Sequence, residues 1–378
     1  MEREELAGWL RLALTPGVGN TAGRKLLAAF GLPSQVFTQS REALLQVVAD
    51  AQAHALQQVP DGFETQLRQT LDWLQGTDAD GAVRRIVTLG DAGYPASLLE
   101  TADPPLMLYL LGAPAFDLTQ LGRSIAMVGS RNPTAQGEET ARAFARAFGE
   151  AGITVISGLA LGIDGAAHTG ALEAGGPADR LATVAVVGTG LDRVYPVRHR
   201  DLAHRIAAHG LIVSEYPLGT PPLNQNFPKR NRIIAGLARG TLVVEAALRS
   251  GSLITARLAA EQGREVFAIP GSIHSPQSRG AHALIRQGAK LVESVGDVLE
   301  ELRFDAPVAA AQPEQAEPAS ADDSGLLADL GFDPVSLDSL CARTGWSAAQ
   351  LQARLLELEL EGHVARLPGG LFQRVARG

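Results

Sequence analysis

The middle of the chain alternates short apolar runs with longer amphipathic stretches. From Arg84 onward the runs are IVTL, SIAMVG, ITVISG, TVAVVG, LIVSEY, TLVVEA and EVFAIPG. Each run is apolar throughout, as in strands buried on both faces of a sheet. Between most of them lie segments long enough for a crossover helix, such as TAQGEETARAFARAFGEAG. The pattern predicts an α/β fold over residues 79–305, an extended Rossmann-like, doubly wound parallel sheet.

Residues 1–78 have a different pattern, which predicts a small all-helical domain. The stretch LRLALTPGVGNTAGRKLLAAFG predicts two helices joined by a turn at Pro16-Gly17-Val18-Gly19. This turn resembles a helix-hairpin-helix, whose backbone amides can bind a DNA phosphate, and Arg24 and Lys25 lie nearby. The segment nevertheless holds six basic and nine acidic residues. A hairpin that only packs against the core is an equally good interpretation.

The C-terminal part begins with a segment whose composition differs from that of the sheet region. Residues 306–324, APVAAAQPEQAEPASADDS, contain no cation and predict a flexible linker. Residues 325–378 then predict helix, turn, helix and two strands around Pro368-Gly369-Gly370, which is a winged-helix pattern. The second helix carries Arg354 against Glu357, Glu359 and Glu361. Phosphates would repel so acidic a helix, so we expect a protein-contact or regulatory module rather than a DNA reader.

Composition restricts the setting more than the function. The 378 residues contain one cysteine, Cys341, so no intramolecular disulfide can form. The start MEREELAGWL lacks the features of a signal peptide, and no apolar run approaches membrane-spanning length. We therefore expect a cytoplasmic protein with no membrane partner.

The net charge of −8 is unexpected for a protein that binds nucleic acid. Any such site must therefore be a local basic patch. Residues 192–232 form one, with seven basic and three acidic side chains.

The most basic part of this patch is NFPKRNR, at residues 226–232. Pro228 is a plausible first helical residue, and Lys229, Arg230 and Arg232 follow it. A helix N-terminus already carries partial positive charge and normally prefers acidic residues. A sequence that breaks a local rule usually does so for function, and the natural counter-ion here is a phosphate. The alternative is a solvated charge cluster.

Residues of two other loops, and Phe227 beside the basic turn, each have an alternative interpretation. Ser252 is expected to cap a helix, while Gly251 allows backbone to approach an anion. Arg131 can face a phosphate or form an ion pair at the edge of the core. Phe227 can stack on a base or fill the helix–sheet interface. Ligands of doubly wound sheets bind beyond the carboxyl ends of the strands, so we expect one pocket rim formed by residues 129–131, 158–160, 227–232 and 249–252.

Four motifs together resemble one known family. They are Val128-Gly129-Ser130-Arg131, Ser157-Gly158-Leu159-Ala160-x-Gly162-Ile163-Asp164 with Ala167-His168, Phe227-Pro228-x-Arg230-Asn231-Arg232, and Arg249-Ser250-Gly251-Ser252-Leu253-Ile254-Thr255. Their order and spacing are similar to those of the DNA-processing protein A (DprA/Smf) family over residues 94–298. The resemblance implies a dimeric, single-stranded-DNA-binding protein of natural transformation that protects incoming strands and loads the RecA recombinase. It implies no catalysis.

The resemblance and the loop chemistry together assign candidate residues. Arg131, Lys229, Arg230 and Arg232 would neutralise phosphates, and Phe227 would stack on a base. The full expected DNA-binding set is Gly129, Ser130, Arg131, Gly158, Phe227, Lys229, Arg230, Asn231, Arg232, Arg249, Ser250, Gly251 and Ser252. The implied dimer would use Leu284, Ile285, Leu291 and Val292, for which ordinary core packing is an equal alternative.

The rival function is a nucleotide-binding sensor or hydrolase of a related Rossmann-like fold. That chemistry needs a carboxylate in the pocket, and the candidates are Asp164 and Glu245. We expect Asp164 instead to cap a helix with His168 packed nearby, because no further His or Cys completes a metal site. Gly188-Thr189-Gly190 lacks the third glycine of a dinucleotide fingerprint. The sequence thus predicts neither a cofactor nor a metal.

Overall fold

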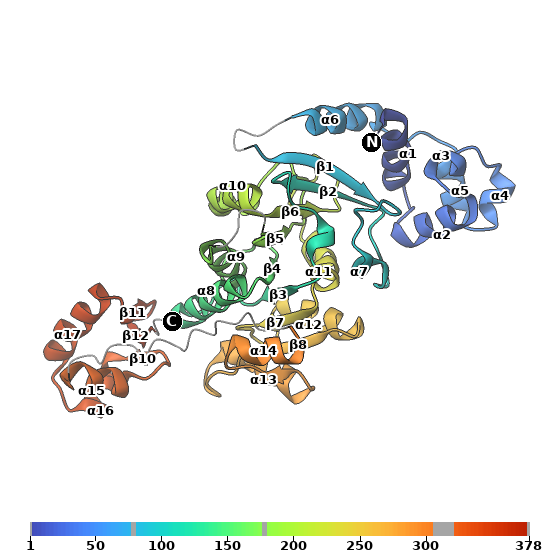
Figure 1. Ribbon diagram of the computed structural model, residues 1–378. Helices are drawn as coiled ribbons and strands as arrows, with labels where there is room; N and C mark the ends of the chain where they lie inside the picture. The colour runs from blue at the N-terminus through green and yellow to red at the C-terminus, as the bar shows by residue number, and fades with distance from the viewer. Residues whose placement is uncertain (1, 77–80, 176–179, 305–320, 376–378) are drawn as a thin grey trace.

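The computed structural model describes residues 2–76, 81–175, 180–304 and 321–375 (Figure 1). The N-terminal part is helical, as predicted. Its elements are α1 (Arg3–Leu14), α2 (Asn20–Phe30), α3 (Pro33–Val36), α4 (Arg41–Leu45), α5 (Asp50–Leu56) and α6 (Phe63–Gln75).

The central part is a large, mostly parallel sheet. Its described strands run in the spatial order β1-β2-β6-β5-β4-β3-β7-β8-β9. Their bounds are β1 (Val83–Thr88), β2 (Met107–Gly112), β3 (Ser124–Val128), β4 (Thr154–Ser157), β5 (Thr183–Val186), β6 (Leu211–Ser214), β7 (Gly240–Val243), β8 (Glu265–Ala268) and β9 (Lys290–Leu291). The seven neighbouring strands β6-β5-β4-β3-β7-β8-β9 pair in parallel, which confirms the predicted Rossmann-like core.

Helices cover both faces of this sheet (Figure 1). Successive strand residues point to opposite faces, so Ile125 and Met127 pack under α8 and α9 while Ala126 and Val128 pack under α11 and α12. The helices are α7 (Ala96–Leu99), α8 (Ala135–Glu150), α9 (Ile163–Glu173), α10 (Arg200–His209), α11 (Asn226–Leu237), α12 (Ser252–Glu261), α13 (Arg279–Arg286) and α14 (Val295–Glu301).

One edge of the sheet departs from the prediction. Strand β2 was missed, and it pairs antiparallel with both β1 and β6. The sheet is therefore mixed at this edge. Strand β1, which contains IVT of the predicted run IVTL, is an edge strand with mostly half-buried residues, so it is not covered on both faces.

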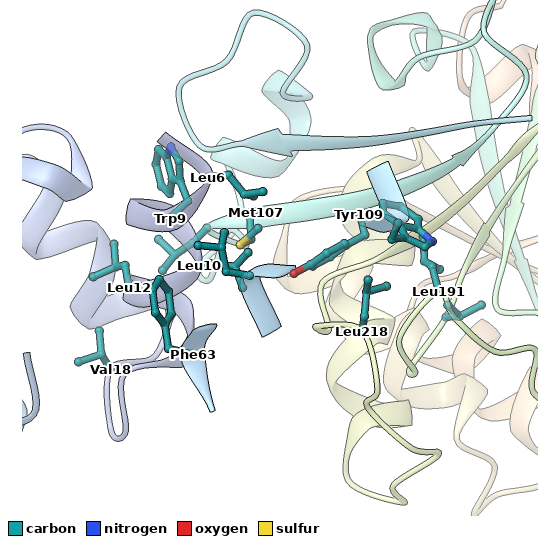
Figure 2. Close-up of a cluster of buried hydrophobic side chains, with 14 of the residues drawn as sticks. Leu6, Trp9, Leu10, Leu12, Val18, Phe63, Met107, Tyr109, Leu191 and Leu218 are labelled. Carbon is teal, nitrogen blue, oxygen red and sulfur yellow. The ribbon is translucent and has the colours of Figure 1, made fainter. Parts of the chain in front are cut away.

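The N-terminal helices share one hydrophobic core with the edge of the sheet (Figure 2). Leu10 and Phe63 of these helices belong to the same buried cluster as Met107 and Tyr109 of β2. The ring of Trp73 contacts that of Tyr109 edge-on, with 5.9 Å between centroids. The predicted boundary at residue 78 therefore separates two sequence patterns, while the packing continues across it.

The C-terminal part contains the predicted winged helix. Helices α16 (Leu337–Thr344) and α17 (Ala348–Leu360) are followed by strands β11 (Val364–Leu367) and β12 (Leu371–Arg374). Two further elements were not predicted, α15 (Ala321–Leu330) and β10 (Val335–Ser336), and β12 lies between β10 and β11. Most of the predicted linker, residues 306–320, lies outside the described residues. Its predicted end at 324 is too late, because α15 begins at Ala321.

Among the described helices, none has the length and apolar character needed to cross a membrane.

Candidate nucleic-acid interface

The main pocket lies where the order of the strands reverses. Strand β3 sits between β4 and β7, and the chain leads away from it in both directions. A cavity of about 500 Å³ opens at the carboxyl ends of these strands. Its wall includes residues from all four loops that the sequence predicted there. Among them are Arg131, Ala160, Pro228, Arg230 and Arg249. Open α/β sheets bind their ligands at such reversals.

Helix α11 enters this pocket, but it starts earlier than predicted. Its first residue is Asn226, two positions before Pro228. The side chain of Asn226 is buried and its Nδ2 donates to the carbonyl oxygen of Gly188 at 3.0 Å. Because of this start, Arg230 and Arg232 lie in the second turn rather than the first. The three cations of the motif consequently point into different surroundings.

Arg230 belongs to the pocket wall but is buried there, so it does not face the pocket as a free cation. Its side chain is 5% exposed, and its guanidinium donates to the carbonyl oxygens of Gly158 and Val186. A Cβ on Gly158 would lie 2.3 Å from this guanidinium, so glycine is required there to admit it. These contacts and the burial of Arg230 argue against the expected phosphate contact of this residue. The backbone donor expected at Gly158 stays a prediction, because the contact with Arg230 uses its carbonyl oxygen. Both residues build the protein interior.

Asp164 completes this buried group, which we call the pocket floor (Gly158, Asp164 and Arg230). The Asp164 Oδ2 lies 4.0 Å from Arg230 Nη2 and accepts a hydrogen bond from Ala160 N at 3.2 Å. Burial raises the pKa of Asp164 above its usual value, although the Arg230 charge opposes the shift. Burial also lowers the pKa of Arg230 to about 10. Asp164 was expected at the N-cap of a helix, but it is the second residue of α9, and Gly162 occupies the N-cap position.

Arg232 is likewise engaged with protein groups. Its guanidinium contacts the carboxylate of Glu215, and its Nε lies 3.3 Å from Asp103 Oδ2. Asp103 in turn accepts a hydrogen bond from Asn20 Nδ2 of the N-terminal hairpin at 3.1 Å. Arg232 thus links α11 to the helical domain, and its side chain is only 14% exposed. This placement argues against a direct phosphate contact.

Three other cations lie in or next to the pocket wall, and we call them the pocket rim (Arg131, Lys229 and Arg249). Arg131 and Arg249 line the pocket, and Lys229 stands in the chain between the lining residues Pro228 and Arg230. All three are exposed. None takes part in an ion pair with the residues that the structure describes. The ion pair considered for Arg131 is therefore not found within those ranges. Within the described part of the chain, the rim thus offers positive charge that is not tied up in an ion pair.

Phe227 contributes an aromatic face to this rim. The Arg131 guanidinium carbon lies 5.7 Å from the centroid of the Phe227 ring. On the same side of the site, the Tyr195 ring approaches Phe227 with 5.5 Å between centroids and a tilt of 33°. Sequence reasoning missed Tyr195, because only the fold brings residues 195 and 227 together. The signal available in the sequence was an aromatic residue within the basic segment 192–232, a combination that is typical of nucleic-acid binding.

The serine-rich loop before α12 is arranged differently from the prediction. Helix α12 begins at Ser252, so Gly251 occupies the N-cap position and Ser252 is buried. The Ser250 hydroxyl contacts the Ser252 hydroxyl at 2.7 Å. A Cβ on Gly251 would meet open space, and Asn231 Nδ2 donates to the Gly251 carbonyl oxygen at 3.4 Å. This loop still forms part of the pocket wall together with Gly129 and Ser130.

The carboxylates and histidine considered for catalysis are occupied by structural contacts. Glu245 accepts hydrogen bonds from Thr134 N at 2.9 Å and Thr134 Oγ1 at 2.6 Å, which anchors the start of α8. His168 is fully buried, with Nδ1 2.7 Å from Thr183 Oγ1. Burial lowers the pKa of His168 to about 3. No group of three or more potential metal ligands occurs among the described residues.

The four residues expected at a dimer interface divide into two kinds. Val292 is fully buried within the core beneath α8 and α14, so it is not an interface residue. Leu291 is 44% exposed, and Ile285 is half-buried. Leu284 is half-buried and lines a groove of about 670 Å³ between α12 and α13. The exposed edge next to β9 thus retains Leu284, Ile285 and Leu291 as candidates.

A family model confirms the class of this chain. The model described as DNA recombination-mediator protein A matches residues 85–303, and the DprA winged helix domain matches residues 309–370. The chain belongs to the DNA recombination-mediator protein A (DprA/Smf) family. The resemblance read from the four motifs is therefore confirmed.

Relatives and solved structures of this family agree. Protein Smf of Escherichia coli is 42% identical over 312 residues, which are 80% of each chain, and Protein Smf of Synechocystis is 34% identical over 99% of this chain and 100% of its own. DNA processing protein A from Streptococcus pneumoniae has a TM-score of 0.65 at 36% identity, covering 81% of this chain and 99% of its own. The Helicobacter pylori protein, whose structure concerns its single-stranded DNA binding mode, has a TM-score of 0.51 at 28% identity, covering 59% of this chain and 98% of its own.

Proposed function

We propose that this protein is a non-enzymatic single-stranded-DNA-binding protein, and that the pocket rim is its binding site. The observation that carries the proposal is that Arg131 and Arg249, exposed and without carboxylate partners in the described ranges, line one pocket with the ring of Phe227. Lys229, also exposed, follows Pro228 of the same wall in the chain. Cations can neutralise the phosphates of a strand while the aromatic face stacks on a base. Such a site is sequence-tolerant, because every base has a stacking face.

Several features favour an unpaired strand over a duplex. The pocket is a hollow at the carboxyl ends of the strands, and its wall contains the ring of Phe227 together with Arg131 and Arg249. A base must leave its partner to stack on Phe227. The Helicobacter pylori relative, described by its single-stranded DNA binding mode, supports the same class of ligand.

The expected DNA-contact set changes once burial is considered. We retain Gly129, Ser130, Arg131, Phe227, Lys229, Asn231, Arg249, Ser250, Gly251 and Ser252 as residues that contact or shape the path of the strand. Arg230, Arg232 and Gly158 support that surface from within. Affinity is thus assigned to fewer charges than the sequence suggested.

Fluorescence anisotropy tests the proposal with labelled single-stranded and duplex oligonucleotides of the same sequence. We expect the single strand to bind more tightly than the duplex. We also expect that mononucleotides do not displace the labelled single strand at concentrations that would saturate a nucleotide-specific site. Equal or tighter duplex binding would contradict the choice of ligand. Efficient competition by a mononucleotide would favour the rival, a nucleotide sensor or hydrolase of related fold.

The wider role that we propose is the one that the resemblance to the DprA/Smf family implies. The protein would act in the cytoplasm during natural transformation, as a homodimer that protects incoming single strands and loads RecA onto them. The exposed edge with Leu284, Ile285 and Leu291 supports the dimer. The rate at which RecA assembles on a labelled strand, with and without the protein, tests the loading step. An unchanged rate would restrict the function to binding.

The winged helix is proposed to contact a protein rather than DNA. Helix α17 is acidic on its outer face and leaves Leu356 and Leu360 exposed. Removal of residues 306–378 should then keep single-strand affinity within several-fold of the full chain. A loss of a hundredfold with the core still folded would show that the winged helix binds DNA.

A further inference from the structure

A second exposed surface lies beside the pocket, on residues 192–200, which we call the Tyr195 segment. Two of its large side chains face solvent, Tyr195 at 45% and Val197 at 76% exposure. Basic side chains follow at once, Arg198 and Arg200. Exposed aromatic and apolar groups next to cations are typical of a surface that binds a partner.

This segment is fixed to the protein near both ends. Asp192 Oδ1 accepts a hydrogen bond from Gly219 N at 2.8 Å. Near the other end, His199 Nδ1 lies 3.0 Å from the carbonyl oxygen of Leu159, in the loop above the pocket floor. The His199 ring packs so closely that a Cβ on Gly165 would lie 2.7 Å from its Cε1. Tyr195 is therefore exposed on an anchored segment, which limits the entropy lost when a ligand binds.

The aromatic surface of the pocket continues onto this segment. The rings of Tyr195 and Phe227 are in contact, and a small hollow of about 80 Å³ is lined by both rings and by Arg131. When one base stacks on Phe227, the next base of the strand can therefore stack on the neighbouring ring of Tyr195. Adjacent aromatic faces are how single-strand binders hold successive bases.

Positive charge also extends in this direction. Arg198 and Arg200 are exposed, and neither forms an ion pair with a residue in the described ranges. Asp192 of the segment is paired with Arg193 at 2.8 Å, and Asp201 is the next acidic residue along the chain. Arg200 follows Tyr195 by five positions, so their Cα atoms lie within about 18 Å of each other. That span is short enough for one strand to meet both.

We propose that a single strand of nucleic acid continues from the pocket across Tyr195, which stacks a base, and onto Arg198 and Arg200, which bind the phosphates that follow. This inference rests on the proposed function and adds a second contact segment to the same path. It assigns binding residues that neither the four family motifs nor the pocket wall contain. Strands long enough to leave the pocket gain affinity from it, and strands that only fill the pocket do not.

The test of the ring uses fluorescein-labelled oligothymidylates of about 6 and about 20 nucleotides, lengths that bracket common single-strand site sizes. Tyr195→Ala should weaken binding of the longer strand by about 5- to 100-fold, the effect of losing one stacked base. Tyr195→Phe keeps the ring and should bind like the wild type. If Tyr195→Phe is as weak as Tyr195→Ala, or if Tyr195→Ala binds the longer strand normally, the stacking role is overturned.

The test of the charges compares two double variants that each remove two exposed arginines. Arg198→Ala/Arg200→Ala should flatten the log–log salt dependence for the longer strand by about 1.4, or about 0.7 for each lost phosphate contact. The matched control, Arg68→Ala/Arg239→Ala, removes an exposed arginine of α6 and one just before β7, and should leave that slope unchanged. Arg239 lies at the amino end of β7, whereas the pocket opens at the carboxyl ends of the strands. Equal losses in the two variants would show a general field effect and overturn the inference.

The length comparison separates this inference from the proposed function. Equal losses for both oligonucleotides would place the Tyr195 segment inside the pocket site and overturn the extended path. If the wild-type protein binds neither oligonucleotide, the proposed function itself fails. If it binds both and the Tyr195 segment variants behave as wild type, only the extension fails.

Discussion

The pocket floor and the pocket rim contain the same kinds of charged residue in opposite states. On the floor, Arg230 is buried against two carbonyl oxygens and lies 4.0 Å from Asp164. On the rim, Lys229 directly precedes Arg230 in the chain, yet it is exposed and has no carboxylate partner in the described ranges. Neighbouring cations can thus serve stability in one case and ligand binding in the other. Burial and partners decide which, and residue type does not.

The energetic reason is desolvation. A buried charge is costly unless its partners stay in place, so removing one partner leaves the other uncompensated. An exposed cation costs little and is free to neutralise a phosphate. Changes on the floor should therefore appear in the free energy of unfolding, and changes on the rim should appear in the affinity for DNA and its salt dependence.

The largest expected effect is on the floor. Arg230→Met should lower the free energy of unfolding by about 3–5 kcal/mol, because Asp164 and the carbonyl oxygens of Gly158 and Val186 lose their partner. Urea unfolding measures the loss. The double variant Arg230→Met/Asp164→Asn should recover part of it, since no buried carboxylate is then left alone. A single variant as stable as the wild type would contradict the assignment of Arg230 to the floor.

A second contrast between buried and exposed neighbours tests the dimer. Val292→Ala should lower the free energy of unfolding by about 1–3 kcal/mol, because Val292 is fully buried. Leu291→Glu should change it by no more than about 0.5 kcal/mol, because Leu291 is exposed. If the edge is the interface, Leu291→Glu should sediment as a folded monomer. A monomeric wild-type protein would refute the dimer directly.

The pH dependence of stability should follow a group beneath the floor. The pKa of His168 is lowered to about 3 in the folded protein, below the value of about 6.5 in the unfolded chain. As the pH falls below 6.5 the unfolded state binds the proton first, so stability falls, by about 1.4 kcal/mol per pH unit, until the pH approaches 3. Thermal unfolding of His168→Asn across this range should show a shallower slope. An unchanged slope would mean that other groups cause the acid sensitivity.

The smallest effects on stability are expected at the rim. Lys229→Ala and Arg249→Ala should each change the free energy of unfolding by no more than about 0.5 kcal/mol. Each should flatten the log–log salt dependence of single-strand binding by about 0.7. Arg239→Ala, at the amino end of β7 and away from the carboxyl ends where the pocket opens, is the matched control for one lost charge. If Lys229→Ala melts much lower while its salt slope is unchanged, Lys229 belongs to the structure and the comparison fails.

The sequence predicted most of the sheet because buried parallel strands are continuous apolar runs. It missed β2, which lies at the antiparallel edge, and β9, which spans only Lys290–Leu291. The start of α11 was misplaced because Pro228 is a good first helical residue, whereas Asn226 is held there by its hydrogen bond to Gly188. Such a bond joins residues far apart in the chain and leaves no local pattern.

The sequence by itself determined the fold class, the family and the four loops that meet at the pocket. Strand runs and loop motifs are local in the chain, and the position of the loops follows from the geometry of a doubly wound sheet. Only the tertiary structure decided which cations are free. Successive residues of a helix point about 100° apart, so Lys229 and Arg230 face different surroundings. The carbonyl oxygens that hold Arg230 belong to Gly158, just after β4, and to Val186, the last residue of β5. No local pattern encodes the distance of these residues from α11.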